Sequence, residues 1–194
     1  MNIDFKHSRV MRWVRPKGER TDTVTMTPRE FFDRHVEPAY DAWLKDNLSE
    51  WKMQAAIAAL NNMAAWSFDY WSSRDKAKLY SANNDRAYRE MLARECPAFA
   101  LVRDIADGHK HVSLDRKSRC VTKASQTTVE WYPDAFGSGS GEDAYDPFNA
   151  FAIGADWFVV TLDDGTKKAV HNVAHDVYSM WWTLVHRWGH SRPN

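Results

Sequence analysis

The chain has 194 residues, and its 26 basic and 26 acidic side chains give a formal net charge of zero. Hydrophobic residues make up 44% and charged residues 27%, which excludes disorder over most of the length. The balanced charge argues against a protein built throughout to bind nucleic acid or an acidic membrane, and two cysteines are too few for a disulfide framework. Because no apolar run approaches the ~20 residues of a membrane span and the first residues lack a signal-peptide core, we expect a cytoplasmic protein with no membrane partner.

Residues 1–26 are rich in basic side chains and precede the first helix signal. The basic residues here are Lys6, Arg9, Arg12, Arg15, Lys17 and Arg20. We expect a solvated basic N-terminal arm, with contact to phosphate or to a partner subunit as the functional alternative. Residues 27–194 are expected to form a single domain, because the length fits one domain with attachments.

The motif Thr27-Pro28-Arg29-Glu30 is typical of a helix N-terminus. Threonine caps the helix, proline fits its first position, and glutamate closes a capping box. We expect this helix to reach about Asn47, with a kink or a break at Pro38, which has no N–H to donate.

Ser49 is expected to cap a second helix over residues 50–73. Apolar and aromatic residues lie on both sides of this helix, which is typical of the middle helix of a bundle. Its polar residues Asn61, Asn62 and Asp69 are therefore expected to be buried and hydrogen-bonded to neighbouring helices, with a catalytic role as the alternative.

The later elements place strands between two groups of helices. In chain order we expect helices over 83–95 and 98–109, separated by Cys96-Pro97; short strands over 112–123 and 126–132; a flexible acidic loop over 133–146; a hairpin of 151–162 and 166–170 that turns at Asp164-Gly165; and a helix over 172–188. The expected fold class is mainly α, a helical bundle with a small β-hairpin or β-sheet insertion at about 112–170 before the last helix.

The chain is rich in tryptophan, with ten in all. Five of them, Trp43, Trp51, Trp66, Trp71 and Trp181, fall in expected helices with apolar neighbours at helical spacing. We therefore favour a core-filling role for these side chains. A stacking platform for nucleobases is the functional alternative.

The helix over 98–109 carries the residues that are most typical of a catalytic site. On a helical projection His109 lies with the apolar residues, whereas Asp104 and Asp107 lie on the opposite arc with His111, and Arg103 borders that arc. A core histidine beside a surface ion pair is one interpretation. The other is a site in which the imidazole transfers protons near neutral pH and the guanidinium holds a phosphate.

Arg103-Asp104, then four residues, then His109 resembles the Arg–polar–spacer–His motif of the HEPN superfamily. The resemblance implies an α-helical bundle, a homodimer and metal-independent RNA cleavage without a cofactor, as in phage-defence or toxin systems. It assigns His109 as the general acid and base, Arg103 to charge on the phosphate, and Asp104 to orienting the pair. RNA binding without cleavage, or a non-catalytic interaction protein, is the alternative.

Basic residues continue directly after this motif. Lys110, His111, Arg116, Lys117 and Arg119 are candidates for binding RNA phosphates. A solvated strand edge is the structural alternative, because lysine at an edge also deters aggregation.

The last expected helix carries histidines at four-residue spacing. His171 and His175 have the spacing of zinc ligands, but no glutamate lies between them as in zinc peptidases; we expect no metal. Instead, we expect an interface, most simply of a homodimer, on an arc of this helix outside its apolar stripe. This arc carries Tyr178, Trp182, His171, His175 and His186. Protonation of these histidines near pH ~6.5 would make the association sensitive to pH.

Overall fold

A computed structural model of the chain describes residues 26–108, 119–121, 123–132 and 155–189. The expectations for the basic arm, for residues 109–118 and for the acidic loop over 133–146 therefore lie outside the described residues.

The first helical stretch begins as the sequence predicts and is interrupted near Pro38. Helix α1 (Pro28–Phe31) starts with a complete capping box, in which the Glu30 N–H donates to Thr27 Oγ1 at 3.1 Å and the Thr27 N–H donates to Glu30 Oε2 at 2.8 Å. A π-helical turn, η1 (Phe32–Val36), then leads into α2 (Glu37–Leu44), which has Pro38 in its first turn. This π-helical turn directly precedes the turn with Pro38, which has no backbone N–H to donate to the helix.

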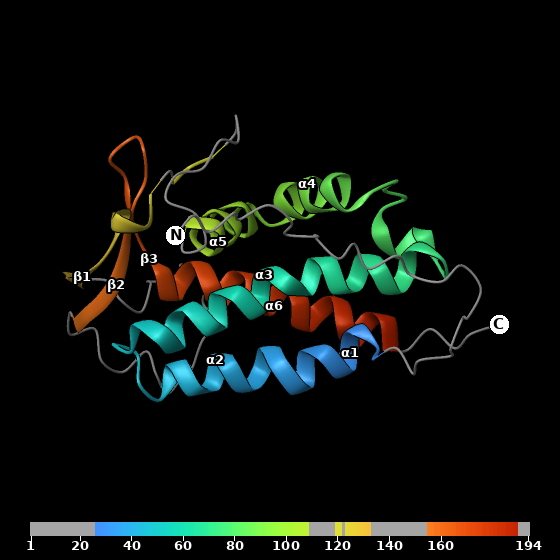
Figure 1. Ribbon diagram of the computed structural model, residues 1–194, viewed down its shortest axis with the longest axis horizontal. Helices are drawn as coiled ribbons and strands as arrows, with labels where there is room; N and C mark the ends of the chain where they lie inside the picture. The colour runs from blue at the N-terminus through green and yellow to red at the C-terminus, as the bar shows by residue number, and fades with distance from the viewer. Residues whose placement is uncertain (1–25, 109–118, 122, 133–154, 190–194) are drawn as a thin grey trace, which may run out of the picture.

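Helix α3 (Glu50–Ser72) is the central helix of the bundle. It contacts α1, α2, α4, α5 and α6, and it runs beside α6 through the middle of the molecule (Figure 1). The helix starts after Ser49 as expected, but the Ser49 side chain makes no capping hydrogen bond.

The expectation that three polar residues of α3 are buried is correct for only one of them. Asn61 is 4% exposed, and its Oδ1 accepts a hydrogen bond of 2.8 Å from Arg89 Nη1. Among the described residues, Asn62 and Asp69 are exposed. The side of α3 that carries these two residues is exposed to solvent. The expectation that α3 is buried on both sides is therefore wrong for this part of the helix.

The next two helices meet at the expected boundary. Helix α4 (Asp85–Glu95) follows a short 3-10 turn, η2 (Lys76–Leu79), and is capped by Asn84, whose Oδ1 accepts the Ala87 N–H at 2.8 Å. Cys96 has an extended backbone, as a residue before proline should. Helix α5 (Pro97–Gly108) starts directly after it.

Three antiparallel strands form the β-insertion, in the order β1-β2-β3. They are β1 (Thr127–Tyr132), which follows the 3-10 turn η3 (Ala124–Gln126), β2 (Ala155–Thr161) and β3 (Lys167–Ala169). The β2–β3 turn forms at the expected place, with Gly165 at a φ of 85°, a conformation that glycine adopts without strain. The expected strand over 112–123 is wrong for the part that the structure describes. There the Cys120 N–H donates to Asp104, and the Cys120 carbonyl accepts from the Asp163 N–H. The backbone groups of Cys120 therefore do not pair with a neighbouring strand.

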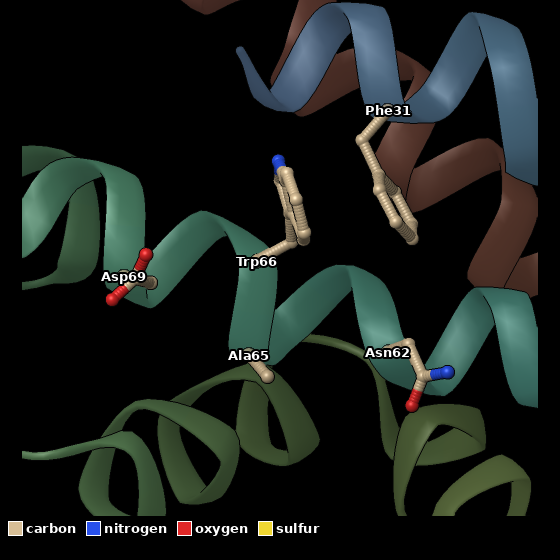
Figure 2. A pocket seen from close by; sticks show the side chains of 5 residues that line it. All are labelled: Phe31, Asn62, Ala65, Trp66 and Asp69. Atoms are coloured by element: carbon tan, nitrogen blue, oxygen red, sulfur yellow. The ribbon is translucent and has the colours of Figure 1, made fainter. Parts of the chain in front are cut away.

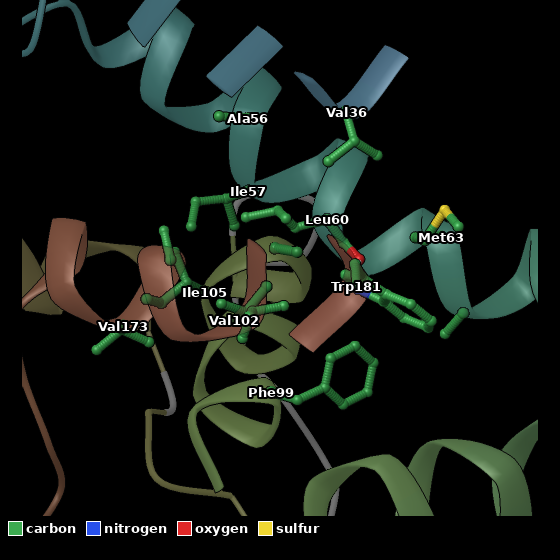
Figure 3. Packing of buried hydrophobic residues seen from close by; sticks show 14 of the residues in the cluster. Val36, Ala56, Ile57, Leu60, Met63, Phe99, Val102, Ile105, Val173 and Trp181 are labelled. Carbon is green, nitrogen blue, oxygen red and sulfur yellow. The ribbon is translucent and has the colours of Figure 1, made fainter. Parts of the chain in front are cut away.

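Helix α6 (Val170–Gly189) follows β3 directly and closes the bundle. Its Trp181 is fully buried, and the indole N–H donates to the Leu60 carbonyl of α3 at 3.0 Å. Phe99 of α5 meets the Trp181 ring edge-on, and Val102 and Ile105 of α5 lie in the same cluster (Figure 3). The fold is therefore mainly α, with a small sheet before the last helix, as the sequence predicts. In the part of the chain that the structure describes, no helix is long and apolar enough to cross a membrane.

Candidate functional site

The structure places two of the three expected catalytic residues, and it gives Asp104 a structural contact. Asp104 is 1% exposed, and its Oδ2 accepts the Cys120 N–H at 2.7 Å. The helical projection placed Asp104 opposite the apolar arc, but it is buried because the segment of Cys120 and Val121 packs against that side of α5. Arg103 is partly exposed on the preceding position of the helix. His109 lies outside the described residues.

Of the five residues expected to bind RNA, only Arg119 is described, and it is partly exposed. Lys110, His111, Arg116 and Lys117 lie outside the described residues. A positive surface next to Arg103 therefore stays a prediction.

Neither cysteine is activated as a nucleophile. Burial raises the pKa of the Cys120 thiol, and the negative charge of Asp104 adds to this effect. Burial also raises the pKa of Cys96. Because the thiolate is the reactive form, both shifts disfavour cysteine chemistry near neutral pH.

Two residues of the expected interface on α6 pack inside the bundle instead. The His171 ring lies 4.9 Å from the Trp157 ring of β2 and 6.0 Å from the Trp43 ring of α2, measured between centroids. Tyr178 stacks on Tyr40 of α2 at 4.6 Å, and its hydroxyl donates to Glu37 Oε1 at 3.5 Å. Helical periodicity within α6 cannot show that aromatic residues of α2 pack on this side of the helix. For this reason both residues were predicted to lie on an exposed surface.

Burial among aromatic rings also changes the acidity of these groups. Burial lowers the pKa of His171 to about 4, and the neighbouring His175 contributes to the shift. Burial raises the pKa of Tyr178 to about 12, with Glu37 as the next cause. Both side chains are therefore uncharged at neutral pH.

The other expected interface residues lie on the solvent side of α6, and we call this surface the exposed arc. It consists of His175, Asp176, Ser179, Trp182, Thr183, His186 and Arg187, of which His186 is only partly exposed. Trp182 is 48% exposed, and its ring lies 3.9 Å from the His186 ring. The His186 Nδ1 lies 2.7 Å from the Trp182 carbonyl oxygen, so Nδ1 is the protonated nitrogen that donates this bond.

The histidine spacing of α6 does not assemble a metal site in the described residues. The rings of His171 and His175 are stacked, with centroids 6.3 Å apart. No group of three or more His, Cys, Asp or Glu side chains that could hold a metal ion occurs among the described residues.

A pocket between α1 and α3 contains residues that the sequence did not assign to a site. Its volume is about 470 Å³, and it is lined by Phe31, Asn62, Ala65, Trp66 and Asp69 (Figure 2). The sequence signal for it is weak: Asn62, Trp66 and Asp69 share one side of α3 through helical spacing. The pocket was not predicted because Asn62 and Asp69 were expected to be buried.

No protein-family model matches the chain, and neither a curated protein nor a solved structure matches it. The resemblance to the HEPN superfamily therefore stays a prediction.

Proposed function

We propose that this chain is a non-catalytic binding protein that works as a homodimer, with the exposed arc of α6 as the dimer interface. The observation that carries the proposal is the half-exposed Trp182 at the middle of the arc. Tryptophan is enriched at the centres of protein interfaces and is costly to leave in water. The buried Asp104 supports binding over catalysis, because its carboxylate already holds the backbone of Cys120.

The charges of the arc are self-complementary in an antiparallel contact. Asp176 lies toward the start of α6 and Arg187 toward its end, and both are exposed. A two-fold axis near Trp182 brings Asp176 of each copy toward Arg187 of the other and packs the two Trp182 rings together. The small Ser179 and Thr183 beside Trp182 let the helices approach. Opposite charges at the two ends fix this orientation, because a parallel arrangement places like charges together.

Sedimentation equilibrium at pH 8 tests this interface. We expect a dimer whose dissociation constant rises at least tenfold in Trp182→Ala, while Trp51→Ala, which removes an exposed tryptophan from α3, leaves it unchanged. Asp176→Lys or Arg187→Asp alone should weaken the dimer, and the double variant should restore it. A monomer at every concentration, or equal effects of the two tryptophan variants, contradicts the proposal.

The ribonuclease activity implied by the resemblance is tested separately. Total RNA is incubated with the protein in the presence of a chelator, and wild type is compared with His109→Ala and Arg103→Ala. The proposed binding function predicts no cleavage by any of the three. Cleavage by wild type that both variants lose would replace this proposal with a ribonuclease.

A further inference from the structure

The end of α3 carries the aromatic side chains Trp66, Phe68, Tyr70 and Trp71, and two of these rings lie against a cation of the same chain. The Arg74 guanidinium carbon lies 4.3 Å from the centroid of the Tyr70 ring, and Lys78 Nζ lies 3.8 Å from that of the Trp71 ring. This end of the helix thus places cations over two of its rings. The Trp66 ring lies one turn before them on α3.

Two contacts hold the Trp66 ring in place. The Trp66 indole N–H donates to the Met26 carbonyl at 3.0 Å. The ring stacks on Phe31 of α1, with centroids 4.9 Å apart and planes inclined by 21°. Figure 2 shows Trp66 standing between Phe31 and Asp69. Its second face is therefore turned toward the Asp69 side of the pocket and is fixed before any ligand arrives.

One charged group flanks this face along α3. Asp69 lies three residues after Trp66, one helical turn away, whereas Asn62 lies four residues before it, on the Phe31 side of the ring (Figure 2). In the part of the chain that the structure describes, the Asp69 carboxylate makes no hydrogen bond and no ion pair. Ala65 is small and leaves the floor of the pocket open. The free face of Trp66 is thus flanked by a carboxylate that has no partner among the described residues.

We propose that this pocket binds the guanidinium group of an arginine side chain. A guanidinium is planar and stacks on an indole face, while its N–H groups donate to the Asp69 carboxylate. An ammonium group cannot stack in this way, and it is more strongly hydrated. The pocket is built from α1 and α3 and uses no residue of the exposed arc of α6. The inference therefore goes beyond the proposed dimer and can fail independently of it.

The arginine has two sources, and they share one chemistry. One is an arginine on the surface of a partner protein. The other is an arginine of residues 1–25, since the chain reaches the pocket at Met26, whose carbonyl oxygen accepts the Trp66 indole N–H.

The test follows the indole N–H resonance of Trp66 in ¹⁵N-labelled full-length protein, assigned by its loss in Trp66→Phe. The probe is N-acetylarginine methylamide. We expect a saturable shift of this resonance and at least a fivefold rise in the dissociation constant in Asp69→Asn. Glu90→Gln, which neutralises an exposed carboxylate on α4, should bind the probe like wild type. The Asp69 side chain is exposed, so its replacement should leave the fold and the sedimentation behaviour unchanged.

Equal probe affinity in wild type and Asp69→Asn overturns the proposal, as does a shift that does not saturate. Equal affinity for N-acetyllysine methylamide overturns the assignment to guanidinium. The variant Arg9→Gln/Arg12→Gln/Arg15→Gln/Arg20→Gln, which removes every arginine of residues 1–25, separates the sources. Tighter binding of the probe in this variant shows that the chain's own arginine competes for the pocket, and unchanged binding assigns the pocket to a partner.

Discussion

The buried histidine of α6 makes a specific prediction about stability and pH. His171 lies between Tyr40 and Trp43 of α2 and Trp157 of β2, with His175 as its titratable neighbour. Its pKa is lowered from 6.5 to about 4, mainly by burial. Replacement of His171 by phenylalanine keeps a ring in this position and removes the titration.

The sign follows from proton linkage. A histidine with a lowered pKa in the folded state binds its proton more readily when the chain is unfolded, so acid favours unfolding. With pKa values of about 4 in the folded protein and 6.5 in the unfolded chain, lowering the pH from 8 to 5 costs about 2 kcal/mol of stability. The loss begins as the pH falls below 6.5 and stops growing below pH 4, where both states are protonated.

Carboxylates with lowered pKa act in a different range. Hydrogen bonds from Thr27 lower the pKa of Glu30, and a hydrogen bond from Lys167 lowers that of Glu130, both from 4.5. Their stabilising contribution is lost only as the pH falls below about 4.5. The window from pH 8 to pH 5 therefore reports on His171 and not on these two groups.

Urea denaturation at pH 8, 6.5 and 5 measures the effect, with the free energy of unfolding extrapolated to water. We expect wild type to lose about 2 kcal/mol more than His171→Phe between pH 8 and pH 5. His35→Gln, which removes an exposed histidine outside the exposed arc of α6, should behave like wild type. If wild type and His171→Phe lose the same stability, the burial of His171 does not set its protonation and the reasoning is wrong.

Two further substitutions test contacts in the bundle by denaturation at pH 8. Asp104→Ala leaves the Cys120 N–H without its acceptor and should cost about 2–3 kcal/mol, whereas no measurable loss would show that Asp104 does not hold this segment. Trp181→Phe removes the donor to the buried Leu60 carbonyl and part of a fully buried side chain, so we expect a loss of about 2–4 kcal/mol; a loss below about 1 kcal/mol would contradict the packing described for this ring.

Local signals in the sequence were enough to predict where most elements begin, end or turn. The capping box of Thr27 and Glu30, the boundary at Cys96-Pro97 and the turn at Gly165 all occur where expected. Each depends on the backbone of a few neighbouring residues, so the tertiary structure has little influence on it. The apolar stripe of α6 was likewise predictable, because helical periodicity identifies the buried side of a helix.

Only the tertiary structure decided which polar and aromatic residues are available for function. Asp104 and Tyr178 lie outside the apolar stripes of their helices, yet the segment of Cys120 and helix α2 cover them. Asn62 and Asp69 belong to the central helix, yet both are exposed among the described residues and line a pocket beside Trp66 instead. The pattern along one helix records which side is apolar, but the burial of every other side depends on segments distant in the sequence that happen to pack there.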